Sequence, residues 1–467
     1  MKKILILLVL ILTLIKAQAQ WEPDVRLTND AAMSRTTASR GYCLASQGDT
    51  LHVVWYDSRD GNEEIYYKRS TDSGNNWEPD MRLTNALGSS RIPSLTIYAS
   101  TIYLVWSDDR DGNYEIYYKK SIDGGSNWSS DLRLTESPFM TTYPILSVKG
   151  LEMFIIYTEA EGIDYAIFYK RSTDGGLNWG DSVEFTDVYS FSNNASIASD
   201  NSNLYVAWND MRDGNGEIYF KSTTDFGASW IADKRLTNNS ATSGQPQLAL
   251  SSGILYLFWV DARDGGSEIY FSSSSDYGLT WQPDRRLTFA NDNSWYQKVA
   301  AHGKNLYLVW QDNRNANDEI FYMFSKDGGT TWSEEMLLSN NNVTMSELPS
   351  IALTDSMIHI VWTDKRDGPN GDIYYKRNPT GNVVSVEDNK SLNNLFNIYP
   401  NPATDDIYIQ NTENQTGNIE IYNVLGNKVL ISEFKEKVDV SKLPEGMYYL
   451  VINKGKKIES TNFMIIR

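Results

Sequence analysis

The 467-residue sequence is poor in cysteine and histidine, and this scarcity excludes several kinds of chemistry. Cys43 is the single cysteine, so no disulfide can form within the chain. The three histidines, His52, His302 and His359, form neither a metal-ligand cluster nor a nucleophile-activating pattern. No glycine-rich phosphate loop opens a helix. We therefore predict no metal site and no cofactor.

Long apolar runs and net positive charge are also missing. One apolar run, residues 4–15, follows two lysines and precedes Ala17-Gln18-Ala19, which predicts a signal peptide over residues 1–19 and a mature protein from Gln20. No later stretch approaches the roughly 20 apolar residues that a membrane-spanning helix needs, so we expect no transmembrane segment. The formal net charge of -18 repels phosphate, and we expect no nucleic-acid partner.

The sequence does contain a long internal repeat. An aromatic residue that ends an apolar run recurs at a spacing of 51 residues five times and then 52. These residues are Trp55, Trp106, Tyr157, Trp208, Trp259, Trp310 and Trp362, and they number the repeats from first to seventh. Each repeat holds four β-type segments separated by turns rich in Gly, Asp and Asn. Four strands repeated seven times predict an all-β fold, a seven-bladed β-propeller over residues 20–378.

The two ends of the array complement each other. The string Trp-Glu-Pro-Asp-x-Arg-Leu-Thr-Asn occurs at residues 21–29 and again at residues 77–85, so an outer strand opens the chain. The seventh repeat lacks such a strand after Arg377. We expect the N-terminal strand to supply it and so close the propeller, because closure removes an exposed sheet edge.

Six repeats carry the motif Ser/Thr-x-Asp-x-Gly-x-x-Trp, which begins at residues 70, 121, 172, 223, 274 and 325. Its Asp can accept hydrogen bonds from turn amides, its Gly can take a positive φ, and its Trp can be buried between sheets. The motif resembles the Asp-box (BNR) repeats of sialidases and related propellers, over about residues 21–378. The resemblance implies that the Asp boxes are structural and lie on the face opposite the ligand site.

A second repeated string, Asp-x-Arg-Asp-Gly, follows the aromatic residue, as at residues 108–112, and resembles TolB-type propeller repeats. Its carboxylates suit cation sites, but the arginine among them favours local ion pairs. The third repeat lacks this arginine and has Glu159, Glu161 and Asp164 instead. These carboxylates fit a general acid and base, a cation site, or drift in one copy of the repeat.

Residues that depart from the repeat are the candidates for function. Trp295 is the one tryptophan of fourteen outside the repeat positions. Counting fifteen residues back from each repeat aromatic gives a ring at the starts of the innermost strands: Arg40, Arg91, Thr142, Asn193, Gly244, Trp295 and Glu347. Guanidinium groups, a carboxylate and a large aromatic ring suit an anionic or sugar-like ligand, whereas the alternative is an ordinary solvated rim. The predicted ligand-binding residues are Arg40, Arg91, Tyr143, Asn193, Trp295, Tyr296 and Glu347.

Arg91-Ile92-Pro93 resembles the Arg-Ile-Pro core of the sialidase motif. The resemblance implies three convergent arginines, a Tyr nucleophile paired with a Glu, and an Asp acid/base. Arg40 and Arg91 hold ring positions, and Tyr143 or Tyr296 is a candidate to pair with Glu347. We expect a binding module for a glycan or protein ligand, without assigned catalytic residues. The alternative is an exo-α-sialidase or a related glycoside hydrolase.

A polar linker at residues 379–395 precedes a second predicted domain at residues 396–467, whose strand-like runs are enough for a small β-sandwich. Its motifs are Tyr399-Pro-Asn-Pro402, Ile421-Tyr-Asn-Val-Leu-Gly426 and Leu443-Pro-Glu-Gly-Met-Tyr-Tyr-Leu450. They resemble the C-terminal sorting domain of type IX secretion. The resemblance implies a Bacteroidetes-type exporter as a partner, passage through the periplasm and outer membrane, and a secreted or cell-surface protein.

Overall fold

The computed structural model describes residues 21–381 and 396–466, apart from residues 38–39, 163, 188–189, 201, 291, 340–343, 401–402, 412–417, 424–426 and 454–457. The predicted signal peptide and most of the predicted linker lie outside the described residues. The described residues form two compact units, one on each side of residues 382–395. Their regular elements are all β-strands, so the predicted all-β class is confirmed.

The larger unit contains seven antiparallel sheets, one for each repeat. In the second repeat the strand order is β7 (Ser90–Tyr98), β8 (Thr101–Asp108), β9 (Glu115–Ser121) and β10 (Leu132–Arg133). The first repeat contains β2 (Ser34–Arg35), β3 (Leu44–Gln47), β4 (Thr50–Asp57), β5 (Glu64–Ser70) and β6 (Met81–Arg82). The third contains β11 (Met140–Lys149), β12 (Glu152–Glu161), β13 (Asp164–Ser172) and β14 (Val183–Glu184). The fourth contains β15 (Asn193–Asp200), β16 (Asn203–Asp210), β17 (Glu217–Thr223) and β18 (Lys234–Arg235).

The remaining three sheets follow the same meander. The fifth repeat contains β19 (Ser243–Ser251), β20 (Ile254–Asp261), β21 (Glu268–Ser274) and β22 (Arg285–Arg286). The sixth contains β23 (Ser294–His302), β24 (Asn305–Asp312), β25 (Glu319–Ser325) and β26 (Met336–Leu337). The seventh contains β27 (Ser346–Leu353), β28 (Ile358–Asp364) and β29 (Asp372–Asn378), with β1 (Val25–Arg26) paired antiparallel to β29.

The apolar runs that end at the repeat aromatic residues are buried on both faces of their sheets. In β8, Ile102 and Trp106 pack into a core shared with the first repeat, whereas Tyr103 and Val105 pack into a core shared with the third. Successive side chains of a strand point to opposite faces, so a strand between two packed sheets must be apolar at nearly every position. This is why the second strands read as continuous runs without alternation.

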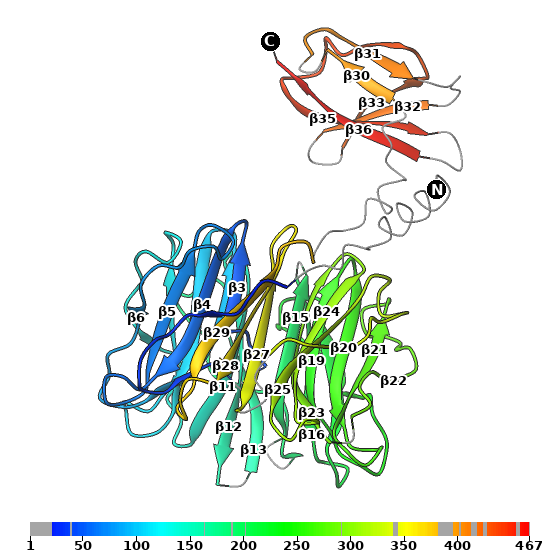
Figure 1. Cartoon of the computed structure of the whole chain (residues 1–467). Helices are drawn as coiled ribbons and strands as arrows, with labels where there is room; N and C mark the ends of the chain where they lie inside the picture. The colour runs from blue at the N-terminus through cyan, green and yellow to red at the C-terminus, as the bar shows by residue number, and fades with distance from the viewer. Residues whose placement is uncertain are drawn as a thin grey trace, which may run out of the picture. The chain divides into compact units, whose positions relative to one another are not determined.

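Neighbouring sheets contact each other through their innermost strands, in the order β3, β7, β11, β15, β19, β23 and β27. β27 in turn contacts β3, so the series of contacts returns to its start. Figure 1 shows the yellow strands β27–β29 beside the blue strands β3 and β4.

The turns of the Ser/Thr-x-Asp-x-Gly-x-x-Trp motif, called box turns below, have the local geometry that their residue types predict. In the first of them, the Ser70 hydroxyl accepts a hydrogen bond from Gly74 N at 2.9 Å, and Asp72 accepts one from Asn76 N at 2.8 Å. The six box glycines have φ of 82–88°. A Cβ on Gly74 would lie 1.9 Å from the Tyr375 hydroxyl oxygen, so both the φ and the close approach require glycine here.

The Trp of each box turn packs edge-on against an aromatic ring of the preceding sheet, with ring centroids 5.3 Å apart for Trp128 and Tyr67. For the first box turn, the preceding sheet is that of the seventh repeat: the ring centroids of Trp77 and Tyr375 lie 5.0 Å apart. Trp21, near β1, lies 5.1 Å from Tyr322 of the sixth repeat. Trp21 therefore takes, for the seventh sheet, the place that box tryptophans take elsewhere.

The smaller unit has a three-stranded and a four-stranded sheet. The first comprises β30 (Phe396–Tyr399), β31 (Asp406–Asn411) and β34 (Lys437–Asp439). The second comprises β32 (Asn418–Asn423), β33 (Lys428–Glu433), β35 (Gly446–Asn453) and β36 (Ile458–Ile465). Both sheets contribute to one apolar core, Ile407 from the first and Ile421 and Leu450 from the second. Two antiparallel sheets thus share one apolar core in this unit.

Candidate functional site

A β-bulge marks the start of the innermost strand in six repeats. The pairing register shifts directly after Arg91, Thr142, Asn193, Gly244, Trp295 and Glu347. The following residues, Ile92, Tyr143, Asn194, Gln245, Tyr296 and Leu348, all have φ of 51–56°. Such a backbone conformation costs a non-glycine residue roughly 1–3 kcal/mol, and bulges redirect side chains. Tyr143 and Tyr296 thus occupy equivalent, strained positions at one end of the inner strands.

The first repeat departs from this pattern, and the predicted place of Arg40 is wrong. Arg35 in β2 pairs with Tyr56 of β4 as Arg91 pairs with Ser107, so Arg35 holds the equivalent ring position. Between this position and Leu44, which corresponds to Leu95 of the second repeat, the first repeat is five residues longer than the second. Counting back from Trp55 failed because the extra residues lie between β2 and β3, which both pair with β4, rather than in the connection before the innermost strand.

The inserted residues reach across to distant repeats. We call residues 36, 37 and 40–43 the crossing segment. Hydrogen bonds join Thr36 to Leu348, Gly41 to Lys298, Tyr42 to Val299 and Gln247, and Cys43 to Ser350. The Tyr42 hydroxyl donates to the Val299 carbonyl at 2.7 Å, and Lys298 Nζ donates to the Gly41 carbonyl at 2.8 Å. A segment of the first repeat is therefore bound to strands of the fifth, sixth and seventh repeats.

The crossing segment brings Arg40 close to Lys298, and we call this pair the cationic centre. Arg40 is 3% exposed and Lys298 is 2% exposed. Burial lowers the pKa of Arg40 to about 10. Burial, together with the charge of Arg40, lowers the pKa of Lys298 well below its usual value. Both shifts disfavour the charged form, but the pKa of Arg40 stays well above neutral pH, so its guanidinium keeps a positive charge in a region of low dielectric, where it attracts an anion more strongly than at the open surface.

Aromatic residues from other repeats surround the cationic centre. The Arg40 guanidinium carbon lies 5.9 Å from the ring centroid of Tyr296, and Tyr143 also acts on the Arg40 charge. Burial raises the pKa of Tyr143, although its side chain keeps 40% of its surface exposed. Trp295 meets Tyr296 edge-on, with centroids 6.4 Å apart. The predicted residues Arg40, Tyr143, Trp295 and Tyr296 therefore lie close together. Of these four side chains, Tyr143 is the most exposed to solvent.

Arg91 and Glu347 belong to a different charged group. Arg91 Nε donates to the Glu63 carboxylate. Glu347 pairs with Arg35 at 3.2 Å and with Lys365 at 3.3 Å. Sequence reasoning assigned no ligand role to Glu63 or Lys365, because nothing in their repeats distinguishes them.

Asn193 accepts hydrogen bonds from two asparagines of its own repeat. Its side-chain oxygen accepts hydrogen bonds from Asn194 Nδ2 at 2.7 Å and from Asn209 Nδ2 at 3.2 Å. No sequence motif marks Tyr42 or Lys298 as a site residue. Ser34 could have identified Arg35 as the ring residue, because the serine before the ring position recurs: Ser34 donates a hydrogen bond to Asp57 as Ser90 does to Asp108.

The unusual carboxylates of the third repeat line a small hollow of about 90 Å³, together with Tyr165. Burial raises the pKa of Glu159, and the charges of Glu115 and Glu161 raise it further. Tyr165 also acts on the pKa of Tyr143, so the hollow adjoins the aromatic residues around Arg40. Across the described parts of the chain, no three or more His, Cys, Asp or Glu side chains are grouped so as to hold a metal ion.

Comparison with known proteins identifies the C-terminal part of the chain first. Residues 397–467 match the family described as the secretion system C-terminal sorting domain. The predicted location is therefore confirmed: type IX secretion exports the protein to the cell surface or beyond. None of the described residues forms a helix long and apolar enough to cross a membrane. A search of curated proteins finds no significant match.

The solved structures similar to this chain include polysaccharide lyases. One is the polysaccharide lyase PL25 ulvan lyase bound to -[GlcA(1-4)Rha3S]-, with a TM-score of 0.56 and 13% identity over 75% of this chain and 95% of the other. Another is the polysaccharide lyase Uly1, with a TM-score of 0.51 and 10% identity over 77% of this chain and 99% of the other. At this identity the likeness concerns the fold alone, an all-β arrangement of propeller type.

Proposed function

We propose that residues 20–378 form a seven-bladed Asp-box propeller closed by its N-terminal strand. Three observations support the closure: β1 pairs with β29, β27 contacts β3, and Trp21 packs on Tyr322 as box tryptophans pack on preceding sheets. The N-terminal string also repeats the ion pairs of an ordinary outer strand, since Asp24 binds Arg366 at 2.7 Å as Asp80 binds Arg59.

We propose that this propeller binds an acidic glycan where the crossing segment meets the innermost strands. The observation that carries the proposal is the convergence of Arg40, Tyr143 and Tyr296 from the first, third and sixth repeats. A guanidinium group suits a sugar carboxylate, and exposed aromatic rings suit the apolar faces of sugars. The likeness in fold to lyases named for acting on polysaccharides, one of them solved with a glucuronate-containing fragment, supports a uronate as the acidic sugar.

Binding without catalysis is the reading that the electrostatics favour. A phenol whose pKa is raised keeps its proton at neutral pH, so Tyr143 donates hydrogen bonds rather than acting as a base. The alternative, a sialidase-type glycoside hydrolase, needs a Tyr–Glu pair and several arginines on one carboxylate. Glu347 instead contacts Arg35 and Lys365, and Arg91 contacts Glu63.

The test is a binding titration of the exported protein with a uronate-rich polysaccharide, beside the same polysaccharide after chemical reduction of its carboxyl groups. We expect the acidic form to bind at least about tenfold more tightly, the size of one charge-assisted hydrogen bond. Tyr143→Phe should weaken binding while leaving the melting temperature unchanged. Equal binding of both forms would remove the role of the cationic centre. Turnover of a fluorogenic sialoside, or release of unsaturated uronate, would establish an enzyme instead.

A further inference from the structure

Lysine recurs at one position of the third strand and joins neighbouring sheets. The members are Lys68, Lys119, Lys170, Lys221 and Lys376. Each Nζ donates to a main-chain carbonyl beside the outer strand of the preceding sheet, on Leu27, Leu83, Leu134, Phe185 and Leu338 respectively. Four of them also pair at 2.7–2.8 Å with an aspartate of their own sheet, namely Asp80, Asp131, Asp233 and Asp24. A primary ammonium group is thus part of the interface between sheets.

The fifth and sixth repeats have no lysine at this position. In the sixth repeat, Met323 is buried in the apolar core between the sheets. In the fifth repeat, Ser272 is too short to reach the preceding sheet, and its hydroxyl donates to the Gln282 carbonyl at 2.6 Å instead. A cavity of about 360 Å³ lies there, between the fourth and fifth sheets.

The groups that hold the ammonium in other repeats line this cavity. Leu236 corresponds to Phe185, whose carbonyl accepts from Lys221, and Asp284 corresponds to Asp233. Arg263 Nη1 donates to Asp284 Oδ2 at 2.5 Å, as Arg212 donates to Asp233 Oδ2 in the fourth repeat, where Asp233 Oδ1 binds Lys221.

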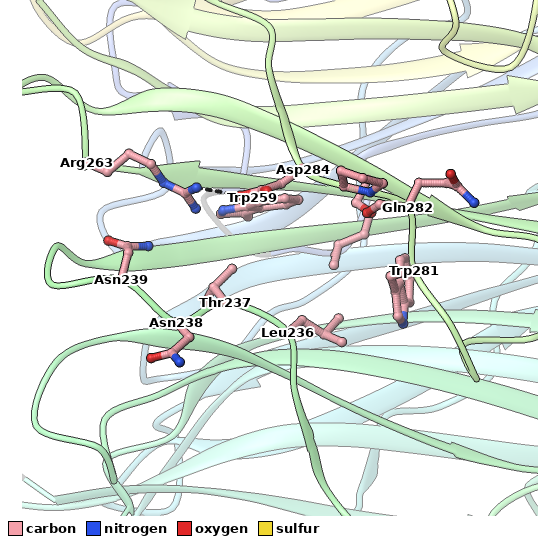
Figure 2. Close-up of a pocket in the computed structure, with 12 residues that line it drawn as sticks. Leu236, Thr237, Asn238, Asn239, Trp259, Arg263, Trp281, Gln282 and Asp284 are labelled. Atoms are coloured by element: carbon pink, nitrogen blue, oxygen red, sulfur yellow. Dashed lines mark hydrogen bonds and ion pairs between the residues drawn. The ribbon is translucent and has the colours of Figure 1, made fainter.

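An aromatic ring completes the site. Trp259 corresponds to Trp208, whose ring centroid lies 5.9 Å from Lys221 Nζ. Its π-face favours a cation. Figure 2 shows Trp259 and Asp284 facing the segment that contains Leu236 and Asn238, with no lysine among the residues that line the cavity.

We propose that this cavity binds a primary ammonium group carried on a short alkyl chain. Its carbonyl and carboxylate oxygens accept N–H bonds, which a quaternary ammonium lacks, and the Asp284 carboxylate binds a charged ammonium more strongly than an alcohol of the same length. Asp284 keeps 41% of its side chain exposed, so the ligand enters from solvent. The volume falls in the range of small-molecule sites. The site shares no lining residue with the proposed glycan site and does not depend on it.

The experiment uses the full exported chain and n-butylammonium chloride, which reproduces the lysine side chain, followed by calorimetric titration. We expect one saturable site, with n-butanol and tetramethylammonium binding at least about tenfold more weakly. Ser272→Lys should abolish the site because its own ammonium fills it. Ser272→Met, which copies the sixth repeat, should do the same without adding a charge.

A gain-of-site variant completes the test. Lys119→Ser recreates the fifth-repeat arrangement in the second repeat and should raise the stoichiometry from one to two. Unchanged binding in both Ser272 variants, or equal binding of n-butanol, would overturn the proposal. Titration with 1,5-diaminopentane and with a lysine-containing peptide then distinguishes a free amine from a protein side chain as the source of the ammonium.

Discussion

Asp108→Asn is the substitution with the best-defined consequence for stability. Asp108 is fully buried and accepts hydrogen bonds from Trp106 Nε1 at 2.9 Å, Ser90 Oγ at 2.7 Å, and Arg110 Nε and Nη2 at 2.7 and 2.6 Å. Although burial raises its pKa, the hydrogen bonds from Arg110, Ser90 and Trp106 outweigh burial and hold the pKa below its ordinary value. The asparagine keeps the size but loses the charge, and its amide places N–H groups against existing donors.

The expected loss of stability depends on the interactions that Arg110 retains. Removing one member of a buried ion pair usually costs about 3–5 kcal/mol. Arg110 retains Asp131 at 2.8 Å and is 22% exposed, so its charge is not left isolated. We therefore expect a loss of about 3 kcal/mol, at the lower end of that range. Urea denaturation of the exported protein, followed by tryptophan fluorescence, measures it.

The third repeat provides the matched control. Glu159 stands where Asp108 stands, but without a following arginine, and burial raises its pKa above 4.5. Asp108 stabilises the fold above its unfolded pKa and loses this effect as the pH falls through its lower folded pKa. For Glu159 the sign is reversed: its contribution is present below the unfolded pKa and is lost as the pH rises through the folded value. Glu159→Gln should therefore stabilise the protein at pH 7 and have no effect near pH 4.

The two variants must shift stability in opposite directions at neutral pH. If both destabilise the protein equally, or if Asp108→Asn stays within about 0.5 kcal/mol of the original protein, the ion pairs act as surface pairs and the argument fails.

Deleting residues 21–28 should lower the melting temperature far more than deleting residues 396–467, because the first deletion removes β1 whereas the second removes a separate unit. Equal melting temperatures for the two truncations would contradict closure by the N-terminal strand. Trp128→Ala should cost about 3–5 kcal/mol through the cavity that it leaves between sheets. Trp295→Ala should leave stability nearly unchanged and weaken glycan binding about tenfold. If Trp295→Ala instead melts as early as Trp128→Ala while the folded fraction still binds, Trp295 is a core residue and the binding site lies elsewhere.

The features that sequence reasoning predicted correctly depend on short-range interactions or on duplicated strings. A box turn involves residues within eight positions of one another, so the roles of Asp72 and Gly74 follow from the motif itself. The pairing of β1 with β29 joins opposite ends of the array, but the duplicated string around Asp24 and Asp80 makes it visible. Repetition thus converts a long-range contact into a pattern.

The features that sequence reasoning missed depend on where an insertion lies in space. Nothing local distinguishes five residues added before a strand from five added within it, so Arg40 rather than Arg35 was assigned to the ring. The contacts of Tyr42 with Val299 and Gln247 join the first repeat to the sixth and fifth, without any motif. A buried lysine such as Lys298 is equally hard to identify from sequence, because its surroundings come from another repeat.

Departures from a repeat have opposite meanings depending on what fills the space. Ser272 and Met323 both replace the lysine between sheets, and the sequence alone does not distinguish these two substitutions from each other. Met323 is 2% exposed and belongs to the apolar core of its interface, so that lapse is a repacking. Ser272 leaves a cavity lined by Asp284 and Trp259, whose counterparts in the fourth sheet contact a lysine. A missing residue therefore becomes evidence for a ligand only where the structure keeps the missing residue's partners in place and leaves its volume open.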